Sequence, residues 1–332
     1  MNFGFNDEQS EIKSTATQFL ADRFKPEVVR ELAEEGRYDD ELWKQVSELG
    51  WPGIAIPEEY DGQGLGMIEL VILCEAMGYA CAPTPFLSNA LAGAMVAAGG
   101  SDDQRARWLP GIASGEGRGA IAVDQGDGPL LVPDAEGAAV LILPIDGRPS
   151  LVDPADAEIE RLELIDPTRS YYSVSASSGE ALEGNPGDGA MRGMVAIAAE
   201  LTGIGQRAMD MAVSYAKERH QFERPIGAYQ AVSHSCARML YDVEEARSLT
   251  YYAAWAADAE PESLPMASAM AKGRAGDAAW DVTKASIQVH GGIGFTWEHD
   301  LHFLLKRARA AGLMYGTASQ SRERVAALAG MG

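Results

Sequence analysis

The sequence predicts a mainly α-helical protein with a small β domain between two helical domains. Apolar residues recur at helical spacing as far as about Glu116, and long helical patterns rich in alanine and methionine return after Met191. Between them lie short apolar runs broken by glycine, proline and aspartate, which are typical of strands. We therefore expect an N-terminal α domain at 1–116, a reduced middle β domain at 117–189 and a C-terminal helical bundle at 190–332.

The N-terminal domain should begin with an amphipathic helix. Asn6 or Asp7 can cap this helix, because both side chains accept hydrogen bonds from free backbone N–H groups. Ile12, Ala16 and Leu20 then recur at helical spacing. Further helices are expected at 42–49, 67–82, 87–98 and 102–113.

The middle segment is short. Its apolar runs at 120–123, 139–143 and 171–174 predict strands. So few residues suffice for a small sheet or sandwich and leave little chain for long loops.

The C-terminal segment predicts four long helices, in which small residues allow close packing. Such helices with short connections favour an antiparallel bundle, and exposed apolar faces of bundles commonly pair with another subunit. The expected helices lie at 191–219, 228–257, 263–290 and 300–311.

Composition excludes several classes of function. The net charge of -22, from 49 acidic and 27 basic side chains, disfavours binding to nucleic acid or to an anionic membrane. The three cysteines, Cys74, Cys81 and Cys236, form no C-x-x-C pair, so neither a disulfide framework nor a cysteine metal site is expected. No apolar run is long enough to cross a bilayer and 1–20 lack the pattern of a signal peptide, so the cytoplasm is the expected compartment.

The first candidate site is the segment 219–230, at the junction of two predicted helices. An arginine fork such as Arg219 at a helix end can bind a pyrophosphate, and Phe222 offers a flat apolar surface to an adenosine. Basic residues near a helix C-terminus followed by a Pro-Ile-Gly turn are also common without any ligand.

The second candidate site is the glycine run in 288–296. Gly291, Gly292 and Gly294 would let the phosphates or ribose of a ligand approach the backbone closely. A glycine run that only terminates a helix is the alternative.

Taken together, the segments 215–230 and 288–309 closely resemble the C-terminal bundle of the acyl-CoA dehydrogenase family. The segments 49–66 and 107–117 resemble the α domain of the same family, so the resemblance covers most of the chain. It implies the acyl-CoA dehydrogenase fold, an N-terminal α domain, a middle β domain and a C-terminal four-helix bundle. It also implies FAD, bound between the middle domain of one subunit and the bundle of its neighbour.

The resemblance further implies which residues contact the cofactor. They belong to the two candidate segments and to the final loop. The expected FAD contacts are Arg219, Phe222, Ile226, Gln230, Gln288, Gly291, Gly292 and Thr317.

The glutamate that serves as the catalytic base in the family is absent from both positions of this sequence that correspond to it. Family members abstract the α-proton of the thioester with a glutamate, found in a Tyr-Glu-Gly-Thr turn where this chain has Tyr315. Other members carry it at the start of the first bundle helix, where Gly193 and Met194 stand. A phenol with a pKa of about 10 is a poor base at neutral pH. Glu200 is expected to be a solvated or paired helix residue, and Glu323 is the next acid to consider.

The middle domain departs from the family as well. The Thr-Glu-Pro-x-x-Gly-Ser-Asp stretch that reaches the flavin ring is replaced at 123–128, and no Trp-Ile-Thr-like strand is recognisable. We expect this chain to bind no isoalloxazine ring of its own. It would still bind the ADP half of a flavin whose ring is bound in a partner chain.

This combination resembles the shortened subunit of the heterotetrameric acyl-CoA dehydrogenases of actinobacteria that act on steroid side chains. The resemblance implies a full-length catalytic partner in an α2β2 assembly, an acyl-CoA substrate and an acceptor such as electron-transfer flavoprotein. FAD would be shared with the partner, and this chain alone would be inactive.

Two other functions remain open from the sequence. The chain could be an autonomous flavoenzyme that uses an unrecognised base such as Tyr315 or Glu200, or a flavin-free scaffold. A metal site is not expected, although His299 and His302 lie close together on the opening turns of a predicted helix. His220 and His234 are expected to be polar helix residues.

Overall fold

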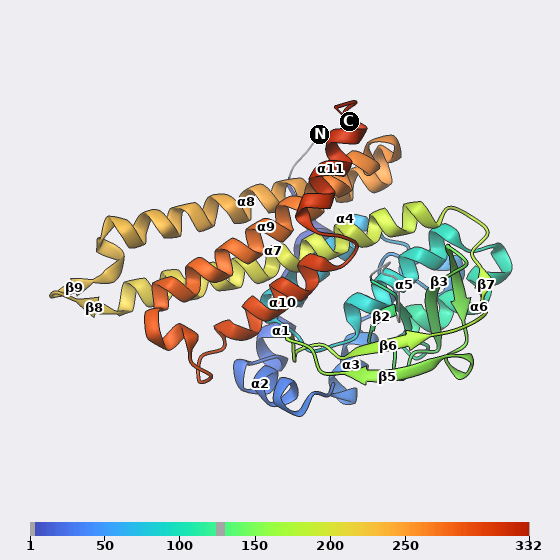
Figure 1. Cartoon of the computed structure of the whole chain (residues 1–332), viewed down its shortest axis with the longest axis horizontal. Helices are drawn as coiled ribbons and strands as arrows, with labels where there is room; N and C mark the ends of the chain where they lie inside the picture. The colour runs from blue at the N-terminus through green and yellow to red at the C-terminus, as the bar shows by residue number, and fades with distance from the viewer. Residues whose placement is uncertain (1–3, 124–129, 332) are drawn as a thin grey trace.

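The computed structural model describes residues 4–123 and 130–331. The molecule is elongated, with long helices along its main axis, the strands of the middle region at one end and a small hairpin at the other (Figure 1). The predicted replacement of the flavin-reaching stretch, at 123–128, lies almost entirely outside the described residues.

The N-terminal part is helical. The helix α1 begins after Asn6, whose side chain and that of Gln9 form a capping box, so the predicted cap is confirmed. The helix α2 was not predicted, because it is short and starts directly at Pro26. The helices are α1 (Asp7–Arg23), α2 (Pro26–Glu35), α3 (Asp40–Glu48), α4 (Met67–Ala80), α5 (Phe86–Gly99) and α6 (Asp102–Ser114).

The β region contains two small sheets. One has the strand order β1-β3-β4-β7 with β1 and β3 parallel, and the other is antiparallel with the order β2-β6-β5. The strands are β1 (Gly119–Ile121), β2 (Leu130–Pro133), β3 (Val140–Ile145), β4 (Arg148–Val152), β5 (Glu158–Leu162), β6 (Tyr171–Ser175) and β7 (Glu180–Ala181).

The two sheets form a thin sandwich, which confirms one of the two predicted arrangements. Leu141 and Leu143 of β3 join Val132 of β2 and Val174 of β6 in a core of their own. The alternate residue Ile142 points to the other face of β3 and belongs to the large helical core. Because successive side chains of β3 point to opposite faces, one face packs against the second sheet and the other packs against the helices.

The C-terminal part consists of long helices joined by short connections. The helix α7 starts at Pro186, earlier than predicted, because Asn185 caps its first turn and proline fits the first helical position. The elements are α7 (Pro186–Glu218), the hairpin β8 (His220–Gln221) and β9 (Arg224–Pro225), α8 (Gln230–Ala259), α9 (Leu264–His290), the 3-10 turn η6 (Gly291–Phe295), α10 (Leu301–Leu313) and α11 (Ala318–Leu328).

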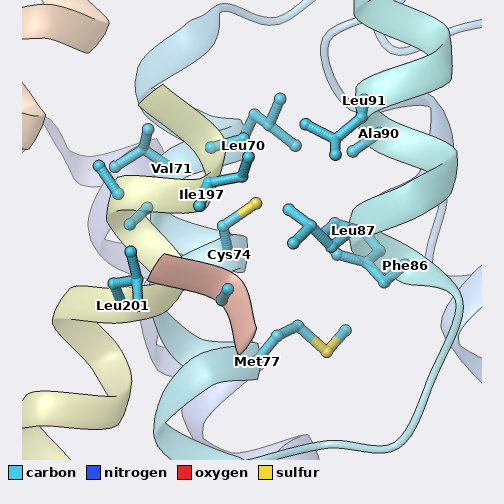
Figure 2. Packing of buried hydrophobic residues seen from close by; sticks show 14 of the residues in the cluster. Leu70, Val71, Cys74, Met77, Phe86, Leu87, Ala90, Leu91, Ile197 and Leu201 are labelled. Carbon is cyan, nitrogen blue, oxygen red and sulfur yellow. The ribbon is translucent and has the colours of Figure 1, made fainter. Parts of the chain in front are cut away.

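The helices α4 and α7 cross at two glycines. A methyl group on Gly78 would lie 2.1 Å from the backbone oxygen of Glu200, and one on Gly203 would lie 2.0 Å from that of Glu75. Figure 2 shows the core beside this crossing, where Cys74 of α4 lies among side chains of α5 and α7. The crossing brings the N-terminal helices into direct backbone contact with the longest C-terminal helix.

The helix α7 spans much of the long axis of the molecule. Its first turns lie near the β region, and its last turn leads into the β8–β9 hairpin at the opposite end (Figure 1). The two ends of α7 are about 48 Å apart at 1.5 Å per residue. Of the described helices, none is long and apolar enough to cross a membrane.

Candidate functional site

The segment 219–230 forms the hairpin end of the molecule. Arg219 ends α7 because its backbone is extended, and its carbonyl accepts a hydrogen bond from the N–H of Ile226 at 2.8 Å. Phe222 is 87% exposed at the tip, and Gln230 opens α8. The predicted junction between two helices is therefore confirmed.

The tip of the hairpin has an unusual backbone. Phe222 and Glu223 both have positive φ, 52° and 66°, between the paired residues of β8 and β9. This pattern suits a two-residue hairpin turn, in which glycine or asparagine is preferred. A phenylalanine held there at a cost in conformational energy is displayed to solvent, which is typical of a functional residue.

The prediction that His220 is a helix residue is wrong. It lies on β8, because the extended backbone of Arg219 ends α7 before it. His234 lies on α8 and is exposed, as predicted.

The glycine run lies at the same end of the molecule. Tyr215 of α7 stacks on His290 of α9 with ring centroids 4.5 Å apart, which ties the C-termini of the two helices together. Gln288 is exposed, and a methyl group on Gly291 or Gly292 would meet no atom within 4 Å. The structure thus brings seven of the eight predicted contacts to one end, with open space over the glycines.

These groups suit an anionic ligand with a flat ring. Within the described part of the chain, the guanidinium of Arg219 has no carboxylate partner, although acidic side chains greatly outnumber basic ones. A free guanidinium can bind a phosphate with two hydrogen bonds, and an exposed aromatic ring can cover a base. The residues present therefore fit the ADP half of a dinucleotide.

Thr317 lies elsewhere. Its hydroxyl accepts a hydrogen bond from the N–H of Gln320 and caps α11, beside the first half of α9. The nearby Lys272 is about 24 Å from Gln288 along α9 at 1.5 Å per residue. Thr317 therefore cannot join the other predicted contacts within one chain.

The two positions counted for the catalytic base meet in space. A methyl group on Gly193 would lie 3.0 Å from Cε2 of Tyr315 and 3.0 Å from Cδ2 of Leu91. The tyrosine ring therefore packs directly over the glycine. Neither position carries a group that could accept a proton at neutral pH.

The loop of Tyr315 is held firmly. Its N–H donates to the carbonyl of Val123 at 3.0 Å, and its φ is 54°. The Lys272 ammonium donates to the carbonyls of Gly312 and Gly316 on either side, at 2.9 and 3.1 Å. Burial raises the pKa of the Tyr315 phenol above its ordinary value, so the phenol stays protonated at neutral pH and cannot take up a further proton.

Glu200 is paired, as one of the two predictions for it stated, but it is fully buried rather than solvated. One carboxylate oxygen accepts from Arg169 at 2.8 Å and from Arg307 at 2.7 Å. Burial alone would raise the pKa of this carboxyl, but the two positive charges outweigh it and hold the pKa below its ordinary value. Glu323 is exposed on α11. Glu200 is therefore a structural carboxylate fixed by two ion pairs. The periodicity of the sequence does not indicate either of its two partners.

The other histidines pack against aromatic rings. The helix α10 begins at Leu301, so His302 lies on its opening turn and His299 precedes it. The ring of His299 accepts a hydrogen bond from the N–H of Leu301 at 3.3 Å. The ring of His302 stacks on Trp297 with centroids 4.4 Å apart. Among residues 4–123 and 130–331, no three histidine, cysteine or acidic side chains are placed to hold a metal.

Comparison with known proteins gives the family. Residues 6–116 match the N-terminal domain of acyl-CoA dehydrogenases and residues 189–329 match their C-terminal domain. The acyl-CoA dehydrogenase IpdE2 of Mycobacterium tuberculosis is 31% identical over 307 residues, which are 92% of each chain. The chain belongs to the acyl-CoA dehydrogenase family.

Solved acyl-CoA dehydrogenase structures agree with this assignment. The steroid ACAD Tcur3481-Tcur3483 has 29% sequence identity and a TM-score of 0.88, covering 98% of both chains. The ChsE4-ChsE5 complex of Mycobacterium tuberculosis, at 24% identity and a TM-score of 0.90, covers 100% of both chains and shows the same fold. Both related structures are heteromeric complexes. Acyl-CoA dehydrogenases are oxidoreductases that act on CH–CH bonds and use FAD, and the fold is the predicted one.

Proposed function

We propose that this chain is one subunit of a hetero-oligomeric, FAD-dependent acyl-CoA dehydrogenase, in which a full-length partner supplies the catalytic glutamate. The observation that carries the proposal is the contact between Gly193 and Tyr315. Two positions that were counted independently along the chain prove to be neighbours, and neither can abstract a proton. A reaction that needs a base must then take it from another chain.

The hairpin end would serve a flavin seated in the partner. The β8–β9 hairpin and the β region lie at opposite ends of the long axis (Figure 1). That separation, about 48 Å along α7, is longer than one dinucleotide. Arg219 and Phe222 can therefore serve only a cofactor whose flavin ring lies in a neighbouring chain.

Each group in this proposal has a defined role. FAD, when bound, supplies the hydride acceptor for α,β-desaturation of the acyl-CoA thioester. Arg219 would pair with the pyrophosphate, Phe222 would cover the adenosine, and Gly291 and Gly292 would admit the ligand to the backbone. Thr317 would act at the other end of the chain, away from this ADP-half site.

We propose an α2β2 assembly, an acyl substrate of the steroid side-chain type and electron-transfer flavoprotein as the acceptor. The heteromeric relatives support the assembly, and the steroid ACAD at 29% identity supports the substrate class. The substrate pocket would lie mainly in the partner, because Tyr315 fills the corresponding space here.

Flavin absorbance tests the proposal directly. The chain purified alone should be colourless, and the complex with its full-length partner should hold about one flavin per pair of chains. A lone chain fully loaded with flavin would overturn the half-site assignment.

Replacing Arg219 by Ala tests the hairpin itself. The assembled complex should lose most of its flavin, because the free guanidinium is the charged group for the pyrophosphate. Arg309→Ala removes another exposed arginine without a carboxylate partner in the described residues and should leave the flavin content unchanged. A fully loaded Arg219→Ala complex contradicts the assigned role.

A further inference from the structure

A cavity of about 610 Å³ lies between α1 and α2 on one side and α4, α7, α8 and α10 on the other. This volume is within the range of small-molecule sites. Arg207, which lines it, is about 21 Å along α7 from Gly193 and about 18 Å from Arg219. The cavity shares no lining residue with either end of the site described above, so its function is independent of the proposed one.

One wall of the cavity is apolar. Side chains from α1, α2, α4 and α10 form a continuous hydrocarbon surface that favours burial of an apolar ligand. The wall consists of Leu20, Phe24, Val29, Ile72, Phe303 and Leu304.

The acidic side chains in the lining are already paired. Glu75 accepts hydrogen bonds from Arg247 and from the hydroxyl of Tyr251, both at 2.9 Å. Asp300 pairs with Arg30. Neither carboxylate is therefore free to attract a cationic ligand.

Three of the four basic side chains in the lining, all except Arg247, are not matched in this way. Among the described residues, Lys13, Lys25 and Arg207 have no carboxylate within ion-pair distance. Arg207 is half-buried and lies over the ring of Tyr79, with its guanidinium carbon 5.4 Å from the ring centroid. In a chain with a net charge of -22, unmatched positive charge beside an apolar wall indicates an anionic ligand.

We propose that this cavity binds an amphipathic carboxylate such as a long-chain fatty acid. The carboxylate pairs with Arg207, whose planar guanidinium presents two parallel donors. The hydrocarbon chain lies along the apolar wall. Lys13 on α1 and Lys25, which precedes α2, both line the cavity and add positive charge that attracts the anion.

Calorimetric titration of the full chain tests the charge requirement. Laurate should bind, whereas dodecanol and dodecyltrimethylammonium, which have the same hydrocarbon chain with a neutral or a positive head, should bind at least tenfold more weakly. Equal binding of laurate and dodecanol would show a merely apolar cavity and overturn the proposal, as would no binding of laurate.

Three variants locate the site. Arg207→Gln should weaken laurate binding by about tenfold. Arg309→Gln is the matched control, since Arg309 also lies 5.4 Å over an aromatic ring, that of Trp280, but outside the cavity. Ala76→Leu should weaken laurate binding, because it adds three carbon atoms to the lining of the cavity from a partly exposed position on α4.

Circular dichroism confirms that each variant is folded. Unchanged laurate binding by folded Ala76→Leu would place the ligand elsewhere and overturn the proposal. A loss of binding in Arg309→Gln equal to that in Arg207→Gln would do the same.

Discussion

At the scale of single residues, the contact between Tyr315 and Gly193 has two consequences. The aromatic ring occupies the space that a glutamate at Gly193 would need, and the missing side chain at Gly193 is what allows the ring to lie there. A glutamate introduced at Gly193 alone would therefore meet the ring of Tyr315. Such a change would also require a smaller side chain at Tyr315.

Tyr315→Phe removes the phenol and keeps the packing. The assembled dehydrogenase should retain its kcat within about twofold, because we assign no proton transfer to this hydroxyl. If Tyr315 were the base of an autonomous enzyme, kcat would instead fall by about 100-fold or more. Steady-state kinetics of the two complexes distinguish these outcomes.

Lys272 makes stability depend on pH in the alkaline range. Burial lowers the pKa of Lys272 from 10.5 to about 8. Between these values the unfolded chain binds more protons than the folded chain, so stability increases with pH. The free energy of unfolding of the wild type should rise by about 2 kcal/mol between pH 8 and 10, relative to Lys272→Met.

Urea unfolding at several pH values measures this difference. Lys284→Met, which removes an exposed lysine from the same helix, should follow the wild type in its pH dependence. Parallel curves for the wild type and Lys272→Met would refute the assignment.

At the scale of secondary-structure elements, the crossing of α4 and α7 depends on glycine. At Gly203 a methyl group would approach a backbone oxygen, which cannot move aside without shifting a helix. Gly203→Ala should lower the free energy of unfolding by about 3 kcal/mol. Thermal or urea unfolding provides the measurement.

Gly312→Ala is the matched control within another helix. A methyl group there would meet no atom within 4 Å, so the usual preference of helices for alanine should apply. This variant should be more stable by up to about 1 kcal/mol. Equal effects of the two substitutions would exclude close packing as the cause.

The sequence predicted elements with strong periodicity better than short ones. The four long C-terminal helices and the caps of α1 follow from spacing and local chemistry. The strand β5 reads Glu-Ile-Glu-Arg-Leu and is largely exposed, so no apolar run marked it. Tertiary pairing with β6, not local preference, makes it a strand.

The candidate site shows the same limit. The hairpin and the glycine run could be predicted because each is a contiguous sequence motif. The contact between Gly193 and Tyr315 could not, because it depends on how α7 packs. The burial of Glu200 was likewise invisible, because Arg169 and Arg307 are 31 and 107 residues away. Local sequence carries no signal for partners that distant.

At the scale of the whole molecule, one ion cluster joins three parts of the chain. Glu200 of α7 pairs with Arg169, next to β6, and with Arg307 of α10. Arg307 also donates to the carbonyl of Ala82, after α4. Removing the shared carboxylate charge would leave two buried cations without the anion that pairs with both of them.

Glu200→Gln should therefore lower the free energy of unfolding by about 3–5 kcal/mol. Limited proteolysis should also cut the β region faster, because its attachment to the helices is weakened. Glu323→Gln, at an exposed position, should change stability by less than about 0.5 kcal/mol. A stable, protease-resistant Glu200→Gln protein would show that packing alone joins these parts.

The length of α7 also bears on how such a protein can evolve. Gly193 lies near one end of this helix and Arg219 at the other, about 39 Å apart at 1.5 Å per residue. Substitutions so far apart act on stability additively, so neither end constrains what is accepted at the other. After a gene duplication, drift can erase the chemistry of one copy at the Gly193 end while selection on assembly preserves its hairpin.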